Sequence, residues 1–382
     1  MTAPSPLLDL DDAASVVAAD VDGSMRSAAL GGAQVRATAA SVTEGALDRL
    51  AGLRPRSVVL VTGPGRAAAA ASVLTAALGS RVGLPLLHLS AVPPWVGPLD
   101  VVVVAGDDAG DPRLLEAADG ALRRGAEVVL AAPDEGPLRA AGAGRAMLLP
   151  PRVHVPDHYA FPRYLAAGLA VLTALESVRA RDLLPDLGEL ADRLDAEALR
   201  GHPENEVFHN PAKSTAVRMR GRRVVLAGDG PATTALARHC AELVLRAAGT
   251  VASAADLGDV LAARARFAGA DAARPADYDP IFHDEELDGP PPVRPVRVFA
   301  LATSGTRAVA GRRIAALPDA ELVLAAGEEE TIEMGGRDMG DRDMGGRAAG
   351  PARGERTEVE QLAVTAVRLG MAAAYLQLIG GS

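Results

Sequence analysis

Cysteine and aromatic residues are scarce in this sequence, and each scarcity excludes a class of structure. Cys240 is the single cysteine among 382 residues, so neither a disulfide framework nor a cysteine-based metal site is expected. Aromatic residues make up only 3% of the chain. A core without many large rings must be built of alanine, valine and leucine, with helices lying close to the sheets.

Basic charge and long apolar runs are also lacking. The chain has 39 basic and 49 acidic residues, a net charge of −10, which disfavours a nucleic acid or an anionic membrane as partner. No apolar run reaches the roughly 18 residues that cross a bilayer. The N-terminus carries Asp9, Asp11 and Asp12 where a secretory signal would be basic and then apolar. These absences predict a cytoplasmic protein.

One pattern occurs twice in a chain that is 49% apolar and can therefore bury two cores. Residues 58–65 and 224–231 each have the pattern of a buried strand, a Gly-x-Gly turn and a helix start. The two copies predict two parallel-sheet domains, each with a ligand cleft at the ends of its strands. The candidate ligand-binding glycines of these turns are Gly63, Gly65, Gly228 and Gly230.

Hydrophobic patterns predict the remaining elements. Strands are expected at residues 57–62, 86–89, 101–105, 128–132 and 147–149, and again at 223–227, 250–253, 296–302 and 322–325. Helices are expected at residues 67–78, 113–124, 164–181, 187–200 and 355–379. The domain prediction is a flexible leader (1–22), a first domain with crossover helices (23–201) and a second domain (202–382).

A Met-Gly-Arg-Asp repeat at residues 333–347 has a period of roughly five, which fits neither a helix nor a strand. We expect a disordered loop at about 328–356 inside the second domain. A Met-rich tract that binds a metal or a partner is the alternative.

The Gly-x-Gly turns do not fit a nicotinamide dinucleotide. Ala68 and Thr233 stand where a third glycine is required, and the strand at 86–89 has no acidic residue for a ribose. Pro64 also removes one backbone N–H donor from the first turn. No cofactor is therefore expected.

Three further segments resemble a known family. The segments are residues 89–100 with the valines that follow, Asn210-Pro211-Ala212-Lys213, and Gly23-Ser24-Met25-Arg26. They are similar to motifs of the bifunctional phosphoglucose/phosphomannose isomerases, which are built from sugar isomerase (SIS) domains. The closest resemblance is to the actinobacterial TobH-type branch. It implies an α/β fold of two SIS-type domains, each a five-stranded parallel sheet flanked by helices, with a C-terminal helix packing across. It also implies a sugar-phosphate ligand and a homodimer.

The sequence departs from the family at the phosphate loop. Where the family has Ser-x-Ser-Gly-Asn-Thr, this chain has Gly106, Asp107 and Asp108, followed by Asp111. We retain Gly106, Asp107 and Asp108 as candidate ligand residues, but carboxylates repel a phosphate dianion. Two like charges 4 Å apart cost about 4 kcal/mol at an effective dielectric constant of about 20. Asp111 is predicted to cap the helix that starts at Pro112.

The catalytic groups that the resemblance implies are also altered. The family's glutamate motif falls on residues 245–249, which contain no carboxylate, and Glu242 lies about one turn early. Residues 283–289 partly resemble the segment with the ring-opening histidine, so His283, Glu285 and Glu286 are catalytic candidates. A solvated acidic loop is the alternative, and a metal site fits less well. The family's catalytic lysine belongs to a helix beyond Ser382.

One loop suits an anion. Thr303, Ser304 and Thr306 follow a predicted strand and precede a helix with three arginines, so hydroxyls and helix-start N–H groups converge there. An ordinary helix cap with solvent-facing arginines is the alternative. His209 and Lys213 are further ligand candidates at the domain junction, although Lys213 would equally pair with a carboxylate.

The sequence thus supports three functions. The favoured one is a binding protein for a sugar phosphate or related molecule that does not convert its ligand and that regulates a pathway enzyme. The second is an active aldose–ketose isomerase that interconverts fructose 6-phosphate with glucose or mannose 6-phosphate. The third is a dimeric scaffold without a ligand. No metal site is expected, since Pro156 excludes a regular helix between His154 and His158.

Overall fold

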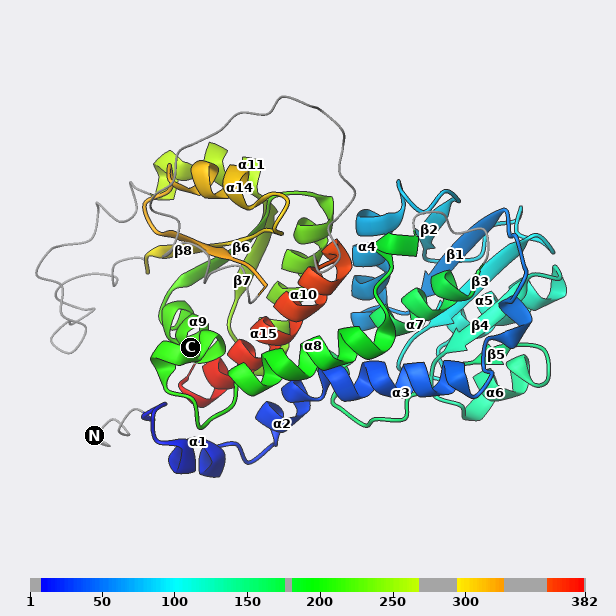
Figure 1. Ribbon diagram of the computed structural model, residues 1–382, viewed down its shortest axis with the longest axis horizontal. Coiled ribbons are helices and arrows are strands. Elements are labelled where there is room, and N and C mark those ends of the chain that lie inside the picture. Colours follow the sequence, from blue (N-terminus) through cyan, green and yellow to red (C-terminus); the bar gives the residue numbers. More distant parts are fainter. Residues whose placement is uncertain (1–7, 176–180, 268–293, 326–355, 381–382) are drawn as a thin grey trace, which may run out of the picture.

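The computed structural model describes residues 8–175, 181–267, 294–325 and 356–380. Two parallel sheets lie on opposite sides of a layer of helices (Figure 1). No helix in these ranges has the length and apolarity needed to cross a membrane. The predicted loop at 328–356 and the three candidates His283, Glu285 and Glu286 lie outside the described residues, apart from Arg356.

The first sheet has five strands in the order β2-β1-β3-β4-β5, all parallel. They are β1 (Ser57–Thr62), β2 (Leu86–Leu89), β3 (Asp100–Ala105), β4 (Glu127–Ala131) and β5 (Met147–Leu148). Val58 and Leu60 point to one apolar core, and Val59 and Val61 point to another. Burial on both faces explains the unbroken valine runs and confirms the five predicted strands.

The second sheet has four strands among the described residues, in the order β7-β6-β8-β9, again all parallel. They are β6 (Arg223–Gly228), β7 (Ala252–Asp256), β8 (Val296–Leu301) and β9 (Ala320–Val323). All four predicted strands are present, with β7 and β9 displaced by about two residues. Strand β7 ends at Asp256 because this side chain caps the next helix, α11 (Leu257–Ala262).

Both sheets change direction at their second strand in sequence. The chain passes from β1 outward to β2 and then back across to β3, and it repeats this from β6 to β7 and β8. In open parallel sheets the crevice at such a switch point, outside the carboxyl ends of the strands, is the usual ligand site. The two switch points therefore lie at the ends of β1 and β3 and at the ends of β6 and β8.

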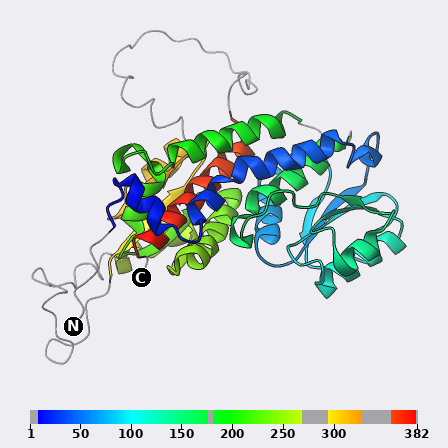
Figure 2. The same ribbon diagram turned by 90° about the horizontal axis from the view of Figure 1, so that it is seen from below.

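Helices α4 and α10 pack against each other between the two sheets, each covering one of them (Figure 1). Helices α3 and α8 run side by side along the molecule (Figure 2). The helices that precede the second sheet in the chain are α1 (Ala13–Ala19), α2 (Ser24–Ala29), α3 (Gly31–Thr43), α4 (Arg66–Leu78), α5 (Pro112–Arg123), α6 (Gly136–Gly142), α7 (Phe161–Ala174), α8 (Leu187–Arg200) and α9 (Pro211–Met219). Among the described residues after β6, the helices are α10 (Pro231–Ala248), α11, α14 (Arg307–Ile314) and α15 (Glu358–Leu378).

Helix α15 is buried along almost its whole length and contacts α2, α4, α8, α9 and α10. It is the C-terminal helix packing across that the resemblance implied. Helix α7 is shorter than predicted, because the backbone at Leu175 is extended and ends it. The domain boundary at 201–202 remains a prediction, since one continuous apolar core joins residues from both sides of it.

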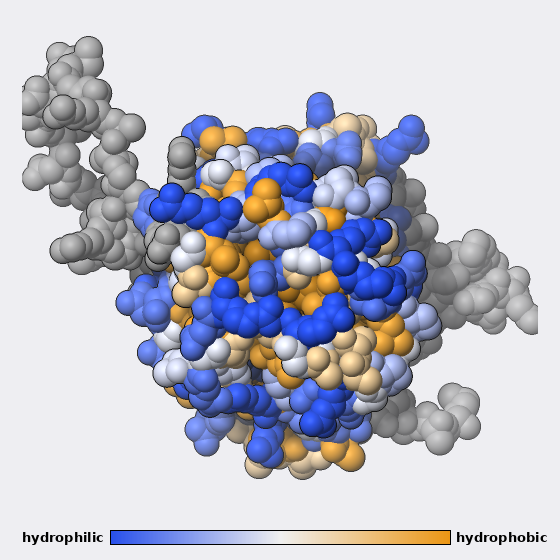
Figure 3. Space-filling model, turned by 90° about the vertical axis from the view of Figure 1, so that its right-hand side faces the viewer, coloured by the Kyte–Doolittle hydropathy of each residue, from blue (hydrophilic) through white to orange (hydrophobic). Residues whose placement is uncertain are grey.

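The helices lie as close together as the scarcity of aromatic residues predicted. A Cβ atom at Gly168 of α7 would lie 2.3 Å from Leu74 Cδ1 of α4, so a larger residue there would require the Leu74 side chain to move. The face at the end of the first sheet is mainly hydrophilic around a smaller apolar area (Figure 3).

Candidate functional site

The first crevice contains the three glycines predicted for it. Gly63 N donates to Ala105 O at 2.9 Å, which joins the end of β1 to the end of β3. Gly65 has φ +89° and begins α4, a conformation that favours glycine. A Cβ at Gly106 would lie 2.6 Å from Leu114 Cδ1, so this glycine lets α5 approach the sheet. The three glycines therefore lie together at the carboxyl ends of β1 and β3, where the prediction placed them.

The carboxylates of the first crevice are all engaged within the protein. Asp107 Oδ1 accepts hydrogen bonds from Arg163 Nη2 at 2.6 Å and from Tyr164 OH at 2.7 Å. Asp108 Oδ1 accepts from Gly110 N at 2.7 Å. These bonds tie the loop to itself and to the first turn of α7.

Asp111 caps α5, as predicted. Its Oδ1 accepts from Arg113 N at 2.9 Å, and its Oδ2 lies 3.0 Å from Arg113 Nη2. The hydrogen bond from the Arg113 side chain, together with that from the Arg113 N–H, lowers the pKa of this carboxyl. Because the ionised carboxylate already pairs with Arg113, this guanidinium has little positive charge left to attract a phosphate.

The second crevice combines glycines with hydroxyls. A Cβ at Gly228 would lie 2.1 Å from Thr234 N, so glycine is required where α10 meets the end of β6. Gly230 N donates to Thr233 Oγ1 at 2.9 Å. Thr234 is 7% exposed, and its Oγ1 has no hydrogen-bond partner within the described part of the chain. That hydroxyl occupies the space beside Gly228, 2.4 Å from where a Cβ would stand.

The Thr303–Thr306 loop closes the second crevice after β8. Thr303 N donates to Thr306 Oγ1 at 3.2 Å, and Thr306 N donates to Thr303 O at 3.0 Å. Ser304 is held by a side chain from α15: Gln361 Oε1 accepts from Ser304 N at 2.7 Å, and Gln361 Nε2 donates to Ser304 Oγ at 2.8 Å. The predicted loop therefore exists, and its donors face an amide that the sequence did not suggest.

One arginine of α14 reaches this crevice. Arg313 Nη1 forms an ion pair with Asp229, the middle residue of the Gly228–Gly230 turn. The Asp229 side chain is 4% exposed, while the Arg313 side chain is 35% exposed. The guanidinium thus remains accessible at the rim of the crevice.

Glu242 does not lie in the second crevice. Its carboxylate forms an ion pair with Arg66, the first residue of α4, so it faces the other half of the molecule. The same guanidinium lies 3.1 Å from His239 Nδ1, and the His239 ring stacks on Phe161 with centroids 4.2 Å apart. Because a guanidinium can only donate, Nδ1 must accept, which places the proton of a neutral His239 on Nε2.

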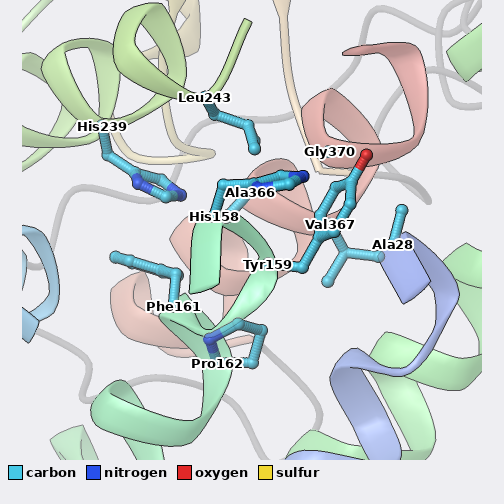
Figure 4. Close-up of a pocket in the computed structure, with 10 residues that line it drawn as sticks. All are labelled: Ala28, His158, Tyr159, Phe161, Pro162, His239, Leu243, Ala366, Val367 and Gly370. Atoms are coloured by element: carbon cyan, nitrogen blue, oxygen red, sulfur yellow. The ribbon is translucent and has the colours of Figure 1, made fainter. Parts of the chain in front are cut away.

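A small cavity lies beside this cluster (Figure 4). It has a volume of about 20 Å³, and His158, Tyr159 and His239 supply its polar lining. That volume holds one water molecule rather than a sugar. A second hollow of about 150 Å³ lies between Ser90–Val92 and the α5 region. Of its three arginines, Arg113 and Arg123 pair with Asp111 and Asp119, and Arg124 donates to Gly120 O at 3.0 Å.

Lys213 has a structural role. It is the single lysine of the sequence and is fully buried. Its Nζ donates to the carbonyl oxygens of Leu10, Pro203 and Asn205 at 2.5, 2.7 and 2.6 Å. All three ammonium hydrogens are therefore used within the protein, and neither a ligand nor a carboxylate has one available.

His209 is exposed and stacks edge-on against Phe208, away from both crevices' hydrogen-bond networks. No group of three His, Cys, Asp or Glu residues suited to a metal ion occurs among the residues that the structure describes. The residues that sequence reasoning missed are Thr234 and Gln361. The Thr-Thr pair after the second Gly-x-Gly turn was a visible signal for the first, whereas nothing local marked the second.

No protein-family model and no curated protein matches the sequence. Solved structures do resemble it. A hypothetical protein from Thermus thermophilus gives a TM-score of 0.61 at 14% identity, covering 97% of this chain and 89% of that one. Tagatose-6-phosphate ketose/aldose isomerase from Escherichia coli gives 0.58 at 15% identity, covering 93% and 90%.

The C-terminal domain of glucosamine-fructose-6-phosphate aminotransferase from Francisella tularensis gives a TM-score of 0.57 at 10% identity, covering 93% of this chain and 95% of that one. At such identities the likeness concerns the fold alone. The chain has the two-sheet α/β fold of the SIS-domain phosphosugar isomerases, which is the fold that the sequence resemblance implied.

Proposed function

We propose that this protein binds a phosphorylated sugar, or a closely related derivative, in the second crevice and does not isomerise it. Within the SIS fold we place it near the TobH-type branch of the phosphoglucose/phosphomannose isomerases. We further propose a homodimer, which the resemblance implies, a cytoplasmic location, which the composition favours, and a regulatory role towards a pathway enzyme, which follows from the altered catalytic motifs.

The observation that carries the proposal is the buried Thr234 hydroxyl at a switch point, which has no partner in the described ranges of the chain. A buried hydroxyl without a partner costs about 1–3 kcal/mol, and a ligand oxygen would remove that cost. The same strand ends carry further candidate groups: the hydroxyls of Ser304 and Thr306 in the loop after β8, and the Arg313 guanidinium of α14, which pairs with Asp229. Hydroxyls, loop N–H groups and a guanidinium are the groups that bind phosphate elsewhere.

The position of Glu242 argues against turnover. It lies eight residues after Thr234 on α10, about 12 Å along the helix axis, and it is bonded to Arg66. A general base must lie within hydrogen-bond reach of the proton it abstracts. A sugar whose phosphate is held at Thr234 and Ser304 therefore has no contact with this carboxylate.

The test compares two substitutions of the same kind. Thr234→Val keeps the shape of the side chain and removes the unpartnered hydroxyl, so we expect the free energy of unfolding to rise by about 1 kcal/mol. We also expect fructose 6-phosphate to bind about 5–10-fold more weakly, the effect of losing about 1 kcal/mol of hydrogen bonding. Denaturant titration and calorimetry measure the two effects.

Thr75→Val is the matched control, because Thr75 Oγ1 on α4 is also buried without a partner among the described residues but lies outside the second crevice. It should change stability in the same direction and leave binding unchanged. The wild-type protein should not interconvert fructose 6-phosphate with glucose or mannose 6-phosphate. Turnover that is lost in His283→Ala or Glu242→Gln would instead support the isomerase, and absence of any sugar-phosphate binding would support the scaffold.

A further inference from the structure

Gln361 occupies the position in the second crevice that an anion would need. Its Oε1 accepts the hydrogen bond of Ser304 N, and its Nε2 donates to Ser304 Oγ. The side chain is 3% exposed and comes from the first turns of α15, so it is a built part of the interior. A phosphate oxygen bound by this loop would accept from the same Ser304 N–H.

We propose that Gln361 is an internal competitor of the ligand: its amide fills the anion position in the empty protein and must leave Ser304 when a phosphate binds. This inference rests on the proposed function and adds a regulatory element to it. The Thr234 hydroxyl beside Gly228, which has no hydrogen-bond partner among the described residues, is independent support that the crevice is built for a further polar group.

Replacement of the Gln361 amide by a phosphate oxygen at Ser304 is favourable. Hydrogen bonds from N–H and O–H groups to a charged oxygen are roughly twice as strong as those to a neutral amide. The displaced Gln361 keeps one partner, because its Nε2 also donates to Arg356 O at 3.0 Å. The amide therefore weakens binding without blocking it.

The position of Gln361 links the crevice to the interior of the whole molecule. Gln361 N donates to Thr357 O, and its neighbour Glu360 forms an ion pair with Arg193 of α8 at 3.0 Å. Helix α15 in turn contacts elements that cover both sheets. Release of Gln361 from Ser304 would therefore alter the first turn of the helix that joins the two halves.

Two substitutions at this position are expected to act in opposite directions. Gln361→Ala removes the competitor, so fructose 6-phosphate and inorganic phosphate should each bind at least about fivefold more tightly, the equivalent of one hydrogen bond no longer broken. Gln361→Glu places a carboxylate against Ser304 N, so both ligands should bind more than about tenfold more weakly through like-charge repulsion. Calorimetry with each ligand measures both effects.

Gln377→Ala is the control, because Gln377 lies near the other end of α15 and contacts Asp22. It should leave both affinities unchanged. Gln361→Met, which keeps the volume of the side chain but has no amide, replaces the alanine variant if that variant does not fold.

The outcomes separate the two proposals. If the wild-type protein binds fructose 6-phosphate and the Gln361→Ala or Gln361→Met variant binds it equally or less tightly, Gln361 is not a competitor and the inference alone fails. If neither the wild-type protein nor the variant binds either ligand, the proposed function fails as well. Tighter binding in the variant together with weaker binding in Gln361→Glu supports both.

Discussion

The spatial neighbours of single residues in this chain change the roles that the sequence suggested for them. Lys213 belongs to a motif that resembles a family signature, yet its ammonium group is bonded to three backbone carbonyls. One of these carbonyls belongs to Leu10, so Lys213 fastens the N-terminal segment to the start of α9. Its task is stability rather than ligand contact.

Replacing this lysine tests that task. Lys213→Met leaves one buried and two partly buried carbonyl groups without their donor, so we expect the free energy of unfolding to fall by at least about 2 kcal/mol. In the wild-type protein the same burial should protect the ε-amine, the only one in the chain, from amine-reactive reagents until the protein unfolds. Denaturant titration and mass spectrometry after labelling measure the two effects, and rapid labelling of the native protein would contradict the assignment.

At the scale of elements, helix caps explain where several helices begin. Asp111, Asp186, Asn210 and Thr357 each accept hydrogen bonds from the first turn of the helix that they precede. Asp111 differs from the other caps because it lies in the loop that corresponds to the phosphate-binding loop of the family that the sequence resembles. Its side chain is committed to α5 instead.

The contribution of the Asp111 cap to stability can be measured by substitution. Asp111→Ala should lower the free energy of unfolding by about 1 kcal/mol, the usual cost of losing an N-cap. Asp119→Ala on the same helix, which removes only an exposed ion pair with Arg123, should cost less than about 0.5 kcal/mol. Thermal or denaturant unfolding distinguishes the two, and equal effects would show that the Asp111 cap contributes nothing special.

At the scale of the whole molecule, a charged cluster joins the two halves. Arg66 at the start of α4 reaches across to His239 and Glu242 on α10. Burial, and then the positive charge of Arg66, lowers the pKa of His239 well below its ordinary value of about 6.5. The contact between the halves therefore requires a neutral imidazole.

This requirement makes stability depend on pH. In the unfolded chain His239 takes up a proton as the pH falls through about 6.5, whereas in the folded protein it stays neutral. The unfolded state then binds more protons, so the free energy of unfolding should fall by up to about 1.4 kcal/mol per pH unit below 6.5 on account of this residue. Burial lowers the pKa of His88 and of His158 in the same direction and adds to the slope.

His239→Asn isolates the contribution of His239 to the pH dependence of stability. The asparagine amide oxygen can accept the hydrogen bond from Arg66 in place of Nδ1, but the amide does not titrate. Denaturant titrations at several values between about pH 7 and about pH 5.5, on either side of the ordinary histidine pKa, should give a shallower slope for this variant than for the wild-type protein. Parallel slopes would mean that His239 is protonated in the folded state.

The local pattern of residues determined most of the architecture by itself. Valine runs without polar alternation marked strands buried on both faces, and Gly-x-Gly turns marked the two crevices. Asp111 could be recognised as a cap because the Asp-Pro pair acts through neighbouring backbone groups. Each of these signals is a pattern within a few consecutive residues, which a sequence displays directly.

Only the tertiary structure decided what the candidate residues do. Gln361 faces Ser304, which is 57 positions away in the chain, Glu242 faces Arg66 across 176 positions, and Lys213 faces Leu10 across 203. Such pairings arise from the packing of α15, α10 and α9 against distant parts of the chain, and no periodicity records them. What a side chain can do depends on the groups that it contacts once it is buried. The tertiary fold determines which groups those are.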